Sequence, residues 1–125
     1  MTNQIQNPNV KYDLEERTAK FGEDMIGFSK KIPKNVITIP LISQIIRAAT
    51  SVGANYCEAD GAESKRDFNH KIAICKKESK EVKHWLRMVV KAEPFLKEQA
   101  KVLWKEAQEL TLIFSSIILS GKRKK

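Results

Sequence analysis

Apolar residues recur at intervals of three and four along most of the chain, which is the spacing that lines one face of an α-helix. The pattern divides into four segments, over about 13–32, 38–60, 64–92 and 96–120. Only a few residues separate them, and short connections favour antiparallel neighbours. We therefore predict an all-α fold, an up-down antiparallel four-helix bundle. In the third segment the apolar series is Phe68, Ile72, Cys75, Ser79, Val82, Leu86 and Val89.

Residues that cap or break helices mark the ends of these segments. Pro33 and Pro94 end the first and third, because the residue before a proline is pushed out of the helical region. Gly61 is placed to end the second, and Ser64 to cap the third. Asp13 is placed to cap the first. We expect each helix to begin and end close to these residues.

The second segment begins with isoleucines that would also suit a β-strand. The steps of three and four continue through Ala49, Val52 and Tyr56, which decides in favour of a helix. Gly53 lies in the middle of this helix, where a glycine costs about 1 kcal/mol relative to alanine. We therefore expect a neighbouring helix to pass close to Gly53.

The end of the fourth segment is more apolar than one helix face requires. Residues 110–119 hold seven apolar residues in ten. A helix that is apolar all round is normally buried all round, whereas each helix of a small monomeric bundle keeps one face in water. The surplus predicts self-association, and a frayed, exposed C-terminus is the alternative.

Composition narrows the class of protein. The chain has 125 residues, 42% of them apolar, with five Gly, four Pro and two Cys. The length and the apolar content are enough for one packed domain. The glycines and prolines are too few for the turns of a many-stranded β fold, and the cysteines are too few for a disulfide framework. No secretory signal and no membrane-spanning run is visible, so we expect a soluble, cytoplasmic protein without a membrane partner. We expect a flexible arm at 1–12, the bundle at 13–120 and a basic tail at 121–125.

The net charge of +8, from 23 Lys and Arg against 15 Asp and Glu, is unevenly spread. Residues 62–92 hold nine basic and four acidic residues, a net +5, and residues 122–125 add +4. The remainder of the chain sums to −1. A concentration of positive charge of this kind suits a phosphate-bearing partner.

Within the third helix, Lys76, Lys80, Lys83 and Arg87 step by four, three and four, so they form one stripe opposite or beside the apolar face. The stripe predicts nucleic-acid binding through phosphates, and a merely solvated helix face is the alternative. A protein-interaction scaffold that docks a partner such as a polymerase also remains open. The predicted contact residues are Lys65, Arg66, Lys76, Lys80, Lys83 and Arg87.

Catalytic and metal-binding patterns are weak. Asp67 precedes His70 by three residues and Glu81 precedes His84 by three, the spacing of ligands in di-iron bundles. Both pairs lie on one helix, about 21 Å apart along its axis, so they cannot share a metal within a subunit. No Gly-rich phosphate loop, GxSxG or HExxH motif occurs. We expect a non-enzymatic protein with no metal and no cofactor.

Polar residues also follow the apolar face of the second helix. Arg47, Ser51, Asn55 and Glu58 step by four, four and three. Polar groups near a core need partners, because an unpaired one costs roughly 1–3 kcal/mol. Glu81 of the third helix is a candidate partner, and so is an Arg47–Glu58 network across a subunit interface. We interpret this set as fixing helix register rather than performing chemistry.

Residues 47–59, RAATSVGANYCEA, resemble the signature of the 23S rRNA intervening-sequence protein family, also called S23-like four-helix-bundle proteins. The family's pattern there is approximately R-x-x-x-S-[VI]-x-x-N-x-x-E-[AG]. Residues 12–18 resemble its usual opening, and residues 64–68 and 74–81 its third helix. The match covers about 12–92, with the fourth helix similar only in pattern.

The resemblance implies an up-down bundle that assembles into a ring-shaped homopentamer, with genes often inside intervening sequences of 23S rRNA genes. A related branch, the accessory proteins of diversity-generating retroelements, forms basic pentameric barrels that bind nucleic acid and a reverse transcriptase. Many relatives carry Gly-Ser where this chain has Lys77-Glu78, so any role tied to that pair does not carry over. The implied signature positions are Arg47, Ser51, Asn55, Glu58 and Glu81.

Overall fold

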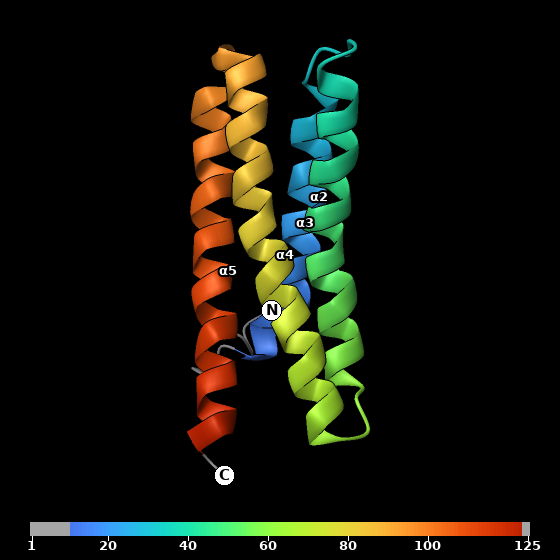
Figure 1. Ribbon diagram of the computed structural model, residues 1–125, viewed down its shortest axis with the longest axis vertical. Coiled ribbons are helices and arrows are strands. Elements are labelled where there is room, and N and C mark those ends of the chain that lie inside the picture. The colour runs from blue at the N-terminus through green and yellow to red at the C-terminus, as the bar shows by residue number, and fades with distance from the viewer. Residues whose placement is uncertain (1–10, 124–125) are drawn as a thin grey trace.

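A computed structural model describes residues 11–123 of the chain. Four long helices lie side by side and alternate in direction, and residues 11–123 contain no strand (Figure 1). The predicted all-α, four-helix architecture is therefore confirmed. The helices are α2 (Lys11–Lys30), α3 (Thr38–Asp60), α4 (Lys65–Ala92) and α5 (Lys97–Arg123), and a single 3-10 turn, η1 (Pro94–Leu96), precedes α5.

Side-chain hydrogen bonds begin α3 and α4 at the predicted places. The hydroxyl of Ser64 accepts from the backbone N–H of Asp67 at 3.0 Å, so Ser64 caps α4. Before α3, the Asn35 side chain accepts from the backbone N–H of Thr38 at 2.9 Å. The Thr38 hydroxyl donates to the carbonyl of Pro33 at 2.5 Å, which ties the start of α3 to the loop before it.

Two helices extend beyond the bounds expected from the sequence. The helix α2 begins at Lys11, so Asp13 lies inside its first turn and is not the N-cap residue. The helix α5 continues to Arg123, so residues 121–123 of the predicted tail are helical. Neither Lys11 nor Gly121 breaks the helical hydrogen bonding, and a glycine near a helix end costs little. The rest of the predicted arm and tail lies outside the described residues.

The predicted apolar faces meet in one core. Every member of the third-helix series is buried except Phe68, which is half-buried. Phe114 of α5 is fully buried and its ring lies 6.4 Å from that of Tyr56 in α3. Close packing of this kind, with burial of whole aromatic side chains, is the main stabilising term in such a bundle.

The helices do not pack equally. The helix α3 packs closely on α2 and on α4, and α4 on α5, whereas α2 and α5 meet over much less of their length. A fork of hydrogen bonds closes this weaker seam: Nε of Arg17 donates to Oε2 of Glu106 at 2.7 Å, and Nη2 donates to Oε1 of Glu109 at 2.7 Å. The bond to Glu106, more than that to Glu109, raises the pKa of Arg17 above its ordinary value, against the opposing effect of burial.

The C-terminal half of α5 is only partly covered. It extends past the start of α2 (Figure 1). Leu112 and Leu119 are 58% and 57% exposed, while Ile113, Ile117 and Ile118 are half-buried against the core. The apolar surplus noted at 110–119 is thus still exposed in a single chain. None of the helices within residues 11–123 is both long and apolar enough to cross a membrane.

Candidate nucleic-acid interface

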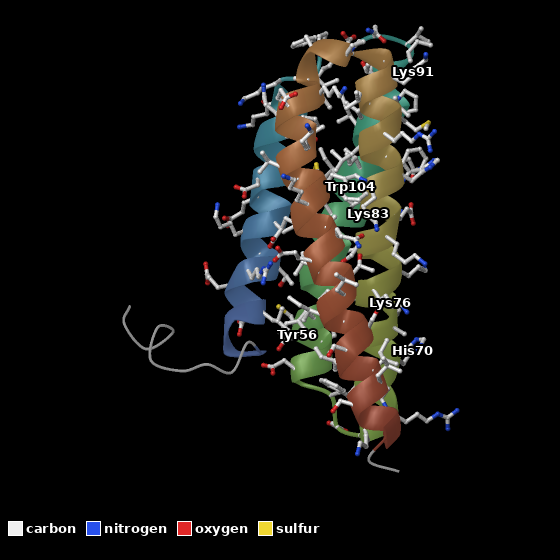
Figure 2. The ribbon with its side chains drawn as sticks, turned by 90° about the vertical axis from the view of Figure 1, so that its left-hand side faces the viewer. Tyr56, His70, Lys76, Lys83, Lys91 and Trp104 are labelled. Atoms are coloured by element: carbon white, nitrogen blue, oxygen red, sulfur yellow. The ribbon has the colours of Figure 1, made fainter. Side chains whose placement is uncertain are left out.

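The basic stripe of α4 lies on the flank of that helix that faces α5. The ammonium of Lys83 donates a hydrogen bond to Oε1 of Gln108 and lies 5.1 Å from the centroid of the Trp104 ring. Figure 2 shows Lys83 and Trp104 next to each other, with Lys76 farther along the same edge of the molecule. Because Gln108 and Trp104 both belong to α5, the stripe borders the α4–α5 seam. We call Lys76, Lys80, Lys83 and Arg87 the basic ridge.

The members of the basic ridge differ in exposure. Lys80 and Arg87 are exposed, whereas Lys76 and Lys83 are half-buried. The other two predicted contacts, Lys65 and Arg66, are exposed in the first turn of α4. From Lys65 to Arg87 the helix rises about 33 Å, so these cations follow one long edge of the bundle.

The ridge cations have no acidic partner among the side chains that the structure describes, those of residues 14–121. The ion pairs within 4.0 Å in that range involve Arg17, Lys20, Arg47, Lys71 and Lys77, and no member of the basic ridge. The two arginines that link helices, Arg17 and Arg47, each face two carboxylates. The ridge charges are therefore not compensated by internal carboxylates and are available to an anionic ligand.

The polar set of α3 lies on the other side of α4. Arg47 Nη1 donates to both carboxylate oxygens of Glu78, at 3.2 and 3.3 Å, and Nη2 donates to Glu81. The indole N–H of Trp85 donates to the same Glu81 oxygen at 2.9 Å. The Trp85 hydrogen bond, followed by the bond and charge of Arg47, holds the pKa of Glu81 below its ordinary value.

The remaining members of that set act separately. The Asn55 amide donates to the carbonyl of Ser51 at 2.9 Å within α3, and Glu58 pairs with Lys71 of α4 at 2.6 Å. The hydrogen bond that the Lys71 ammonium donates to Glu58 raises the pKa of Lys71. Arg47 and Glu58 do not bond to each other in this chain. They join α3 to α4 at two levels instead.

The cysteines and histidines do not assemble into a reactive centre. No group of three or more His, Cys, Asp and Glu side chains within the described part of the chain is placed to hold a metal ion. Cys75 is fully buried, its thiol lies 3.5 Å from the carbonyl of Val52, and burial raises its pKa to about 12. A thiol held protonated in this way is a poor nucleophile.

Comparison with protein families matches residues 11–116 to the family described as 23S rRNA-intervening sequence protein. The match spans α2, α3 and α4 and most of α5. This chain belongs to that family. The sequence resemblance found at residues 12–92 is therefore confirmed, and the match extends it into the fourth helix.

A crystal structure supports the family assignment. The chain is similar to a protein of unknown function from the S23 ribosomal protein family of Bacteroides thetaiotaomicron VPI-5482, solved at 1.70 Å. The TM-score is 0.75 at 28% sequence identity, over 84% of this chain and 97% of the other. Comparison with curated proteins finds no match. Membership of the 23S rRNA-intervening sequence protein family thus explains the fold, but these comparisons identify no reaction.

Two residues in this family member were missed by reasoning from the sequence. Glu78 is only 6% exposed and accepts from Arg47, a pairing that the sequence pattern did not predict. Its spacing of three residues from Glu81 could have indicated a shared partner. Trp104 was assigned no role, yet it is 42% exposed and lies against the basic ridge. Only the packing of α5 on α4 reveals that proximity.

Proposed function

We propose that this protein is a non-enzymatic nucleic-acid-binding protein that contacts phosphates through the basic ridge, with RNA preferred over DNA. The observation that carries the proposal is a set of four ridge cations with no acidic partner among the described side chains, on a flank shared with α5. Lys65 and Arg66 extend the contact surface at the start of α4. The preference for RNA rests on the family's link to an intervening sequence of 23S rRNA.

The length and charge of this edge suit a polyanion. A duplex carries one negative charge per about 1.7 Å of its axis, so an edge of about 33 Å runs alongside many phosphates. Contacts of this kind bind by releasing condensed counterions, so affinity falls steeply with salt and depends little on base sequence. Weak sequence preference is therefore part of the proposal.

The proposal includes self-association into a ring-shaped homo-oligomer, for which the family resemblance implies a pentamer. The exposed Leu112 and Leu119, with the half-buried isoleucines between and beside them, offer an apolar surface for a second copy. In a closed ring every subunit presents the same surface, so the basic ridge would be repeated around the symmetry axis. Repetition of a weak phosphate site raises the overall affinity.

The experiment is a binding titration with labelled structured RNA and duplex DNA across a salt series. Wild type is compared with a variant in which Lys76, Lys80, Lys83 and Arg87 are all replaced by Glu. We expect wild-type affinity to fall steeply with salt, and the variant to lose binding even at low salt. Light scattering on both proteins checks that the oligomeric state is unchanged.

A charge-matched control separates the ridge from overall charge. Lys30, Lys31, Lys34 and Lys97 are exposed and lie off the ridge, so their replacement by Glu changes the net charge equally. We expect this control to weaken binding far less than the ridge variant. Equal losses would mean that only net charge matters. Absence of wild-type binding at low salt would overturn the proposal and favour the alternative of a scaffold for a protein partner.

A further inference from the structure

One exposed aromatic side chain of α5 borders the basic ridge. Trp104 of α5 is 42% exposed, and the ammonium of Lys83 lies 5.1 Å from its ring centroid. Figure 2 places both side chains at the middle of the α4–α5 edge, between Lys76 and Lys91. The indole is therefore open to solvent on a flank that also carries positive charge.

The position of Lys83 is determined by α5. Its ammonium is held by Gln108 as well as by the indole, and Gln108 lies four residues from Trp104, on the neighbouring turn of the same helix. On α5 itself, Lys101 precedes Trp104 by three residues and is exposed. The indole therefore has cations beside it from both helices. Proteins that bind single-stranded nucleic acid combine these two elements, an aromatic platform for a base and cations for the backbone.

We propose that Trp104 stacks against an unpaired base of the bound nucleic acid while Lys83 contacts the phosphate of that strand. This inference rests on the proposed function and specifies its ligand as a nucleic acid with unpaired nucleotides. A base inside a duplex already stacks on its neighbours and has no free face to offer. An unpaired base has one, and every base has a π-face, so this contact needs no particular sequence.

The other tryptophan of the chain lies in a different environment. The indole N–H of Trp85 donates to Glu81, and its ring meets that of His84 edge-on at 4.8 Å between centroids. The nearby Glu78 and Glu81 place carboxylates on that side of α4, where a phosphate would be repelled. Since the chain has two tryptophans, Trp85→Phe leaves Trp104 as a single fluorescent reporter.

The first experiment follows Trp104 fluorescence in the Trp85→Phe variant at low salt. It is titrated with a 12-nucleotide oligouridylate and, separately, with a 12-base-pair RNA duplex. We expect quenching by the oligouridylate and little change with the duplex, because only an unpaired base can stack on the indole. Before ligand is added, acrylamide should quench Trp104. A reporter shielded from acrylamide would overturn the proposal, since the ring would then be covered by another part of the assembly.

The second experiment measures affinity. Trp104→Leu keeps an apolar side chain but removes the stacking surface, and we expect about a tenfold loss of oligouridylate affinity with the duplex unaffected. Val102→Ala, at a 69% exposed apolar position on the same helix, is the matched control and should change neither. Trp104→Phe should retain much of the wild-type affinity.

The outcomes distinguish this proposal from the function on which it rests. Salt-dependent binding of both ligands, without quenching and without an effect of Trp104→Leu, would overturn base stacking and leave phosphate binding by the ridge in place. Failure of both ligands to bind wild type at low salt would overturn both proposals. Equal weakening of oligouridylate and duplex by Trp104→Leu would also overturn stacking, because it would indicate a loss of ridge structure.

Discussion

Gly53 of α3 lies directly against the backbone of Thr18 in α2. A Cβ atom built on Gly53 would lie 3.3 Å from the carbonyl oxygen of Thr18 and 3.4 Å from its carbonyl carbon. Thr18 is 1% exposed, and its hydroxyl donates to the carbonyl of Leu14 at 2.7 Å, so this part of α2 is held in place. The helix-interior glycine predicted a close neighbour, and α2 is that neighbour.

Replacing Gly53 by alanine tests this contact. Alanine favours a helix over glycine by about 1 kcal/mol, but the new methyl group must push helical backbone away. We expect Gly53→Ala to lower the free energy of unfolding by about 1 kcal/mol, measured by urea denaturation. Gly27→Ala is the control, because a Cβ there meets nothing within 4 Å. It should raise stability by about 0.5–1 kcal/mol, and equal responses of the two variants would contradict the close contact.

Removing Arg47 should lower the free energy of unfolding, because the buried Glu78 carboxylate loses its main partner. The Glu78 side chain is 8% exposed, and Arg47→Ala removes its guanidinium partner. Among the described ion pairs, the only cation that then remains near the Glu78 carboxylate is Lys77, at 3.8 Å. Because Arg47 itself is 45% exposed and partly screened, we expect a loss of about 1–2 kcal/mol, smaller than for a fully buried pair. The measurement is chemical denaturation at neutral pH.

A second variant shows whether the buried charge is the cause. Adding Glu78→Gln to Arg47→Ala removes the unpaired carboxylate, and we expect it to recover part of the lost stability. Arg47→Lys should fall between wild type and Arg47→Ala, because one ammonium cannot serve two carboxylates as the guanidinium fork does. Failure of Glu78→Gln to recover any stability would mean that packing, not charge, explains the loss.

The helices were predictable because local signals agree in this chain. The apolar spacing, the Ser64 cap and the breaks at Pro33 and Pro94 all point to the same segments. The start of α2 was missed because Lys11 and Tyr12 carry no signal that separates a helix from an arm. The flank on which the basic ridge lies could not be predicted either. Periodicity orders residues around one helix, but which flank meets α5 depends on the packing of four.

The same limit explains which contacts between site residues could be predicted from the sequence and which could not. Arg47 and Glu81 could be paired from the sequence because both were polar residues beside apolar faces that needed partners. Trp104 and Lys83 could not, since each is an ordinary surface residue on its own helix. Their contact arises only where α4 and α5 run antiparallel with this register. Sites formed between helices are in general hidden from single-helix patterns.

The two cysteines should differ sharply in reactivity. Cys57 is exposed and Cys75 is fully buried, with a pKa raised to about 12 by burial. Burial therefore keeps the Cys75 thiol protonated near neutral pH, and the thiolate is the reactive form. We expect a thiol reagent such as DTNB to react with one cysteine per chain in the native protein and with two after denaturation. Native Cys57→Ser should not react, and rapid labelling of that variant would show that the α3–α4 core opens readily.

Acidification should remove the stabilisation that Glu81 supplies. Its pKa is lowered in the fold, first by the hydrogen bond from Trp85 and then by Arg47. A carboxyl group whose pKa is lowered in the fold makes its full contribution to stability above its ordinary pKa of 4.5. That contribution is lost as the pH falls through the lowered pKa of the folded state. We expect Glu81→Gln to be less stable than wild type at pH 7 by about 0.5–1 kcal/mol and to approach it at pH 3, measured by urea denaturation at each pH. Glu98→Gln, an exposed carboxylate in the first turn of α5, is the control and should not show that convergence. A gap between Glu81→Gln and wild type that is as wide at pH 3 as at pH 7 would assign the loss to packing of the side chain rather than to its charge.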